Sequence, residues 1–183
     1  MLELIIDENF KPPEKTFVFT ASSLNLHRRD KNVKFRRYIL EAIENGKVNA
    51  VITPLELAKL ERYVGEENYY KTYLPVLHSS RSRVFRMKID LDAKRSLNCY
   101  YQLFNPFLGM RAAELSSIIA SIELMLPLIT DDYHHLGIQQ KVIKAYQTRH
   151  KERIDDSLAG KEKRKCFEMY TSQDFYKRFL SKV

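Results

Sequence analysis

Residues 112–132 read AAELSSIIASIELMLPLITDD and contain two patterns in direct succession. Residues 112–124 form the most helix-like stretch of the chain, and their recurring Ala and Ser side chains allow another element to pack closely. The following run, LPLIT at residues 126–130, is short, apolar and bounded by a polar pair, which predicts a buried strand. A helix that leads directly into a buried strand is typical of α/β proteins, in which helices cover a parallel sheet.

The same alternation extends in both directions from this segment. Strand patterns are present at residues 2–6, 16–20, 49–53 and 84–89. Helical patterns are present at residues 33–45, 54–64, within 65–82, at 90–103 and at 137–147. Strands therefore alternate with helices as far as Gln147, which predicts an α/β fold with a mostly parallel sheet.

The charge content and the apolar periodicity of the sequence change after Gln147. Residues 148–183 contain ten Lys or Arg and six Asp or Glu, and their apolar residues are less periodic. We predict an α/β domain over residues 1–147 and a basic helical extension over residues 148–183.

Composition narrows the classes of function. The formal net charge is +8 and the pI is about 9.4, which suits a polyanionic partner such as nucleic acid but is equally compatible with a charge that serves only solubility. Two cysteines are too few for a disulfide framework, and no apolar run has the length of about 18 residues that a membrane span needs. The sequence also lacks the glycine-rich motifs that bind nucleotide phosphates. We therefore expect a cytoplasmic protein without a membrane partner.

Four acidic residues follow predicted strands or begin predicted helices. Asp131 and Asp132 follow LPLIT, Glu114 lies at the start of the preceding helix, and Glu56 follows the strand at 49–53. Sites in parallel sheets form beyond the carboxyl ends of the strands, where such acids could hold Mg²⁺ or Mn²⁺. The alternative is purely structural, because an Asp after a strand also caps helices and a helix dipole favours a Glu in the first turn.

The segment GMRAAE at 109–114, the small-residue helix and the sequence LITDD at 128–132 together resemble the C-terminal half of PIN domains. This resemblance implies a three-layer fold in which three or four acids surround one or two divalent ions. Many PIN domains are ribonucleases, including the toxins of VapBC-type modules. Glu114, Asp131 and Asp132 would then be catalytic residues and metal ligands.

The N-terminal half departs from the family pattern at two positions. Thr20 stands where the first strand of a PIN domain usually ends in Asp, and Lys59 stands in the slot of the second acid. Asp7 follows the first apolar run and offers an alternative ligand. Glu56 lies one helical turn before Lys59 and offers another, with a catalytic role.

Basic residues provide candidate contacts to nucleic acid. Lys59 could contact a phosphate, and two basic clusters could follow a phosphate backbone; the clusters contain Arg28, Arg29, Arg81 and Arg83. The resemblance implies RNA as the partner, together with an antitoxin or a second copy of the chain.

Three functional hypotheses remain. The first is a divalent-metal-dependent ribonuclease of PIN type, with toxin-like character. The alternative is a catalytically degenerate PIN-like protein that binds RNA or a protein without cleavage. The number of carboxylates that meet at the sheet edge separates these two. The third is a structural partner in an assembly, which would use the tyrosine-rich segment at residues 65–82 and the extension at residues 148–183.

Overall fold

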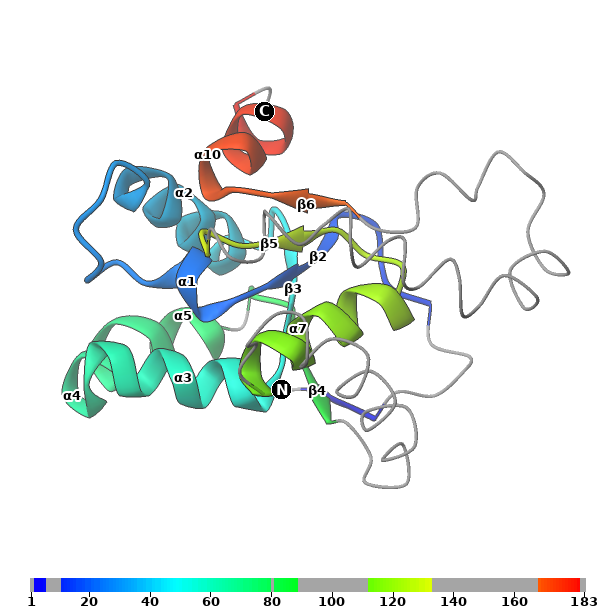
Figure 1. The fold of residues 1–183 in the computed structure, drawn as a ribbon, viewed down its shortest axis with the longest axis horizontal. Coiled ribbons are helices and arrows are strands. Elements are labelled where there is room, and N and C mark those ends of the chain that lie inside the picture. Colours follow the sequence, from blue (N-terminus) through cyan, green and yellow to red (C-terminus); the bar gives the residue numbers. More distant parts are fainter. Residues whose placement is uncertain (1, 6–10, 80, 89–111, 133–167, 182–183) are drawn as a thin grey trace, which may run out of the picture.

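A parallel β-sheet forms the centre of the fold (Figure 1). The computed structural model describes residues 2–5, 11–79, 81–88, 112–132 and 168–181, and within these residues the sheet has six strands in the order β1-β4-β3-β2-β5-β6. Every neighbouring pair is parallel, which confirms the predicted α/β class. The strands are β1 (Leu2–Ile5), β2 (Thr16–Phe19), β3 (Asn49–Ile52), β4 (Val84–Lys88), β5 (Leu128–Ile129) and β6 (Met169–Tyr170).

Helices connect and cover these strands. They are α1 (Ala21–Leu24), α2 (Val33–Glu44), α3 (Pro54–Val64), α4 (Glu66–Asn68), α5 (Leu74–Leu77), α7 (Ala112–Glu123) and α10 (Ser172–Phe175), with the π-helical segments η1 (Tyr69–Tyr73) and η4 (Tyr176–Leu180). The predicted helices that correspond to α2, α3 and α7 are therefore confirmed, whereas those at 90–103 and 137–147 lie outside the described residues. Within the described ranges, no helix combines the length and the apolar character that crossing a membrane requires.

Local sequence signals set the ends of these elements. Gly46 follows α2 with a φ of +67°, a backbone conformation that glycine adopts without steric cost. Thr53 caps α3, because its side-chain oxygen accepts a hydrogen bond from the backbone N–H of Glu56, and Pro54 is the first residue of that helix. Because Thr53 and Pro54 fix the start of α3, Glu56 lies in the first turn of this helix, directly beyond the end of β3.

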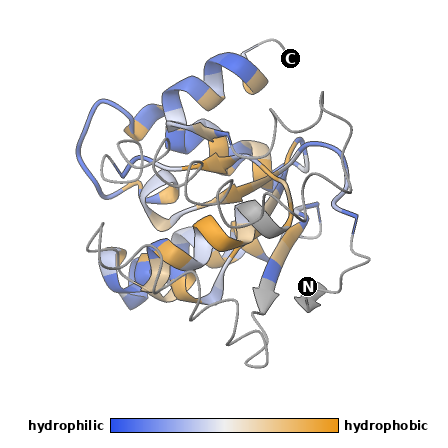
Figure 2. Ribbon diagram, turned by 45° about the vertical axis from the view of Figure 1, so that its right-hand side comes forward, coloured by the Kyte–Doolittle hydropathy of each residue, from blue (hydrophilic) through white to orange (hydrophobic). Residues whose placement is uncertain are grey.

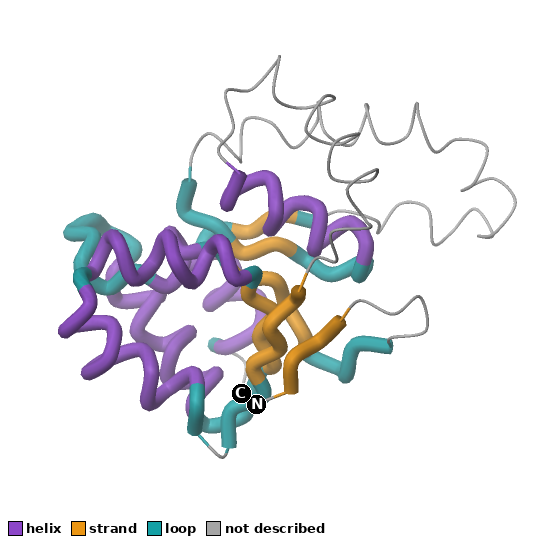
Figure 3. Tube along the Cα trace, turned by 90° about the horizontal axis from the view of Figure 1, so that it is seen from below, coloured by secondary structure: helices purple, strands orange, loops and turns teal. Residues whose placement is uncertain are grey.

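The sheet is covered on both faces, which gives the fold three layers. Alternate strand residues such as Phe17 and Phe19 belong to a large core with α2, α3, η1 and α5. Val18 lies between them on the strand and therefore faces the other side of the sheet, where α7 packs on β2 and β5. Figure 3 shows the strands side by side, and Figure 2 shows apolar residues concentrated on the strands and on α7.

The described C-terminal residues are part of this core. Phe175 is fully buried, and its ring centroid lies 4.8 Å from that of Phe17 and 5.6 Å from that of Phe19. The predicted helical character is present in α10 and η4. The preceding strand β6, which adds to the sheet beside β5, was not expected from the sequence. The predicted boundary between residues 147 and 148 lies outside the described residues.

Candidate functional site

Hydroxyl side chains fill the carboxyl edge of the sheet between β2 and β5. Thr20, directly after β2, has its Oγ1 2.9 Å from Ser22 Oγ and donates to the carbonyl oxygen of Ile129 at 3.2 Å. Ser22 Oγ in turn lies 3.2 Å from Oγ1 of Thr130, the residue after β5. Thr20 is fully buried. Its oxygen therefore ties two strands together, and the position contributes no negative charge to the edge.

Glu56 is a buried carboxylate beside this hydroxyl layer. Its side chain has no exposed surface, and its Oε2 accepts a 2.7 Å hydrogen bond from the backbone N–H of Ala21. Its Oε1 is buried and has no hydrogen-bond partner among the described residues. Burial raises the pKa of Glu56, and repulsion from Glu114 and Asp132 adds to that effect, against the lowering influence of Lys59 and the Ala21 N–H.

Lys59 lies one turn further along α3 and bridges to helix α7. Its Nζ is 3.0 Å from Oε1 of Glu114, in the first turn of α7, and both side chains are largely buried. Burial by itself lowers the pKa of Lys59, but the attraction of Glu56 and the hydrogen bond to Glu114 outweigh it and raise the pKa. Lys59 therefore stays charged among these acids.

The structure thus places two of the predicted acids, Glu56 and Glu114, beside the ammonium group of Lys59, and the charge of a third, Asp132, acts on Glu56. We call these four residues the acidic cluster. They come from α3, from α7 and from the segment after β5. With every group ionised, three carboxylates and one ammonium leave a formal charge of minus two.

The chemistry of the acidic cluster fits a divalent cation, but its present arrangement does not form a metal site. Carboxylate oxygens are the ligands that Mg²⁺ and Mn²⁺ prefer, and the unpartnered Oε1 of Glu56 is a spare acceptor of that kind. However, no three His, Cys, Asp or Glu side chains within the described residues are arranged to hold one ion in common. The cation that Glu114 contacts here is Lys59.

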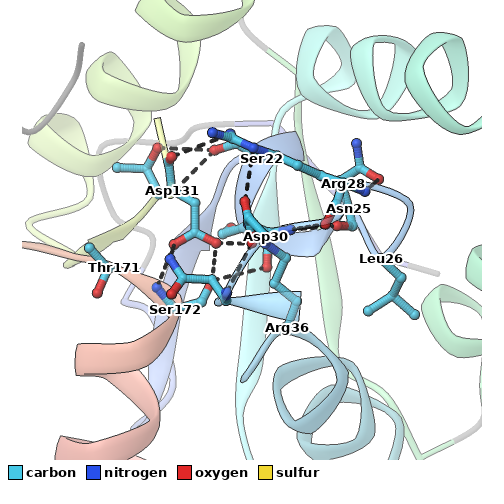
Figure 4. Close-up of polar contacts among 12 residues, drawn as sticks. Ser22, Asn25, Leu26, Arg28, Asp30, Arg36, Asp131, Thr171 and Ser172 are labelled. Atoms are coloured by element: carbon cyan, nitrogen blue, oxygen red, sulfur yellow. Dashed lines mark hydrogen bonds and ion pairs between the residues drawn. The ribbon is translucent and has the colours of Figure 1, made fainter. Parts of the chain in front are cut away.

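Asp131 lies next to Asp132 in sequence but belongs to a different network (Figure 4). Its Oδ2 accepts hydrogen bonds from Arg36 Nε at 2.6 Å and from Ser172 Oγ at 2.8 Å. Its Oδ1 accepts from Asn32 Nδ2 at 3.0 Å and from the backbone N–H of Ser172 at 2.9 Å. These four bonds occupy both oxygens, so the contacts assign Asp131 a structural role and we no longer count it among the candidate ligands.

The sequence analysis did not single out Arg36, which is the centre of this network. Its side chain is fully buried, and Nη2 lies 2.7 and 2.6 Å from the two carboxylate oxygens of Asp30. Its Nη1 donates to the backbone carbonyls of Asn25 and Arg28. A signal for this role was present, because Arg36 lies three residues before Ile39 on the apolar face of α2. We call Asp30, Asn32, Arg36, Asp131 and Ser172 the polar junction.

The two predicted basic clusters lie at opposite edges of the sheet. Arg28 follows α1 near the carboxyl edge, where its Nε is 3.0 Å from Asp30 Oδ2, and Arg29 beside it is exposed. Arg81 and Arg83 precede β4 at the amino edge, and both are exposed. Arg28 and Arg29 therefore share an edge with the acidic cluster, whereas Arg81 and Arg83 do not. Asp7, the alternative acid, lies outside the described residues.

No protein-family model, no curated protein and no solved structure matches this chain.

Proposed function

We propose that the protein is a divalent-metal-dependent ribonuclease of PIN type. The observation that supports this most directly is the acidic cluster, in which carboxylates from separate elements meet at the carboxyl edge with a surplus of negative charge. Edges of this kind are where parallel α/β sheets bind their ligands. Glu56, Glu114 and Asp132 would hold the ion.

Charge balance explains why a cation is needed. A phosphodiester carries a negative charge, and the surplus charge of the acidic cluster would repel it. One divalent ion would balance that surplus. When bound, such an ion supplies Lewis-acid stabilisation and a more acidic water. Lys59, which lies beside Glu114, would be placed to contact a phosphate oxygen.

The choice of RNA and of cellular partners rests on less specific features. The formal net charge of +8 favours a polyanion, and Arg28 and Arg29 lie at the same edge as the acidic cluster. RNA as the substrate, a toxin-like role with an antitoxin or a homodimer partner, and a cytoplasmic location remain parts of this proposal.

A second candidate function is RNA or protein binding without cleavage. The ion pair between Lys59 and Glu114 specifically favours it, because an ammonium group already satisfies one carboxylate of the acidic cluster. Thr20 favours it too, since its oxygen is used in hydrogen bonds within the sheet edge. In this reading Lys59 permanently replaces a metal ion.

Calorimetric titration with Mn²⁺ separates the two candidates. We expect the wild-type protein to bind Mn²⁺ at micromolar concentration and to cleave single-stranded RNA in its presence. Both properties should disappear in the double variant Glu114→Gln/Asp132→Asn, which removes two charges with little change in volume. Glu66→Gln, on the exposed surface of α4, is the matched control and should behave like the wild type. Absence of Mn²⁺ binding by the folded wild-type protein would overturn the nuclease and leave the second candidate.

A further inference from the structure

A cavity of about 280 Å³ lies at the amino edge of the sheet, opposite the acidic cluster. The segment before β2, the C-terminal end of α2 and the helical segment η4 form its walls, and Phe17 and Val48 lie among its buried lining residues. Figure 1 shows α2 and the C-terminal helical segment near each other. The volume is close to the lower end of the range of about 300 to 1,000 Å³ for small-molecule pockets, which suits a ligand the size of one nucleotide.

Aromatic rings make up much of the cavity wall. Tyr38 of α2 and Tyr176 of η4 are stacked, with centroids 4.8 Å apart and an interplanar angle of 26°. Phe17 and Phe179 lie beside them at a centroid distance of 5.0 Å. Tyr38 keeps 42% of its surface exposed although it takes part in a stacked pair. The cavity therefore presents accessible aromatic surface of the kind on which nucleic-acid bases stack.

The charged residues that line the cavity carry a net positive charge. Lys15 and Lys47 are exposed lining residues, and Glu41 is the single acidic residue among the lining residues. The backbone of Lys15 has a φ of +56°, and its carbonyl accepts a 2.9 Å hydrogen bond from the Asn49 N–H, which fixes the position of this residue at the mouth.

A further basic residue lies next to the mouth. A Cβ added to Gly46 would come within 2.6 Å of the backbone oxygen of Arg81, so the Arg81 backbone packs directly against the turn that contains Lys47. Because Arg81 is exposed, its guanidinium adds to the positive charge on this side of the molecule.

We propose that this cavity binds one nucleotide unit, with the base against Tyr38 and the phosphate near Lys15 and Lys47. The combination of flat aromatic surface and a cationic mouth recognises a planar base that carries an anionic group. The unit could come from a free nucleoside monophosphate or from single-stranded RNA, because both present the same chemistry. The proposal does not rest on the acidic cluster, which lies at the other edge of the sheet.

The test measures binding in EDTA, so that metal-dependent events at the acidic cluster do not contribute. AMP, UMP and ribose 5-phosphate are titrated by calorimetry, and a fluorescein-labelled RNA of eight nucleotides is titrated by anisotropy. We expect AMP or the RNA to bind and ribose 5-phosphate to bind at least tenfold more weakly, because it lacks a base. Binding of AMP identifies a free nucleotide as sufficient, whereas binding of the RNA alone identifies the polymer as the source.

Two pairs of matched variants locate the binding. Tyr38→Ala should weaken it about tenfold through the lost stacking surface, whereas Tyr70→Ala, at another exposed tyrosine outside the cavity, should leave it unchanged. Lys47→Ala should weaken binding and reduce its salt dependence, whereas Lys71→Ala, at an exposed lysine of η1, should not. Equal effects within either pair, equal affinity for ribose 5-phosphate, or no binding of any probe by the folded protein would overturn the proposal.

Discussion

Two groups of charged residues lie near the same edge of the sheet and differ in how completely their charges are paired. In the polar junction, Asp131 accepts four hydrogen bonds and the Arg36 guanidinium donates to two carboxylates and two carbonyls. The Oδ1 atom of Asn32 in this junction is buried without a partner among the described residues, but it belongs to a neutral amide. In the acidic cluster, the atom without a partner among the described residues is a carboxylate oxygen of Glu56, and the charges of Glu114 and Asp132 repel that carboxylate. Paired charges fix a structure, whereas an uncompensated charge marks a place where a ligand would gain binding energy.

The largest effect is expected when the cation of the polar junction, Arg36, is removed, and this tests whether the junction stabilises the fold. Arg36→Met leaves the buried Asp131 without the guanidinium that pairs with it and leaves Asp30 with Arg28 as its remaining ion-pair partner among the described residues. We expect the free energy of unfolding to fall by about 3–5 kcal/mol, measured by urea denaturation. Arg37→Met, at the exposed neighbouring position, should change it by less than about 0.5 kcal/mol. A similar result for the two variants would mean that the junction does not stabilise the fold.

The adjacent aspartates give the sharpest form of the comparison. Asp131→Asn places an amide nitrogen among donors from Arg36, Asn32 and Ser172, so we expect a loss of about 2 kcal/mol in unfolding free energy. Asp132→Asn removes one of the mutually repelling charges of the acidic cluster, and its stability should stay within about 0.5 kcal/mol of the wild type. Thermal unfolding of the two variants side by side measures the difference, and the reverse order would contradict the assignment.

The sequence contains enough information to predict the fold. It does not show that Asp131 belongs to the polar junction while Asp132 belongs to the acidic cluster. Alternating strand and helix patterns predict the parallel sheet, and Thr53-Pro54 predicts the start of α3. Strand β6 was missed because Met169 and Tyr170 lie between the polar residues Glu168 and Thr171, whereas the equally short β5 lies within the apolar run LPLIT. Asp131 and Asp132 are equivalent by residue type and position after a strand, and only the tertiary contacts of α2 and α10 distinguish them.

The acidic cluster was only partly predictable for a related reason. Glu56 and Asp132 could be proposed because acids after parallel strands converge on one edge, and Glu114 because it begins the helix that leads into one of these strands. The pairing of Lys59 with Glu114 spans 55 residues of sequence, and it depends on how α3 packs on α7. Arg36 was missed because a buried charge is rare, although its position on the apolar face of α2 was visible.

The contributions of the two groups to folding stability should change with pH in opposite directions. In the acidic cluster, this contribution can be followed through Glu56. Because its pKa is raised in the folded protein, the stabilisation that comes from its proton is complete below the unfolded pKa of about 4.5 and is lost as the pH rises through the folded value. Glutamine does not ionise, so the Glu56→Gln variant does not lose stability in this way as the pH rises. At pH 8 its free energy of unfolding should exceed that of the wild type by about 1 kcal/mol. Urea denaturation from pH 4.5 to pH 8 tests this, and parallel curves for both proteins would refute it.

In the polar junction, the contribution of Asp30 to folding stability should change with pH in the opposite direction. Burial works to raise the pKa of Asp30, but the hydrogen bonds from Arg36 and Asn32 and the charges of Arg36 and Arg28 hold it below its usual value of 3.8. Its contribution is therefore present above that value and is lost as the pH falls through the folded pKa. Asp30→Asn should be less stable than the wild type at pH 7, and the difference should shrink in acid. A difference that grows in acid would contradict the assignment.

A change in Mn²⁺ affinity decides what Lys59 does. Lys59→Met removes the ammonium but keeps an unbranched apolar side chain against Tyr63, whose ring lies 5.8 Å from the Lys59 amine. The substitution therefore removes the positive charge that Glu114 contacts and that acts on Glu56. If the cluster is a divalent-metal site, Mn²⁺ should bind the variant three- to tenfold more tightly than the wild type, a change of about 0.7–1.4 kcal/mol. Lys71→Met, which breaks the exposed ion pair with Glu67, is the control and should leave the Mn²⁺ affinity unchanged. Weaker Mn²⁺ binding by Lys59→Met would show that Lys59 supports the site, and an absence of Mn²⁺ binding in both proteins would leave the acids as a self-neutralised, structural edge of the sheet.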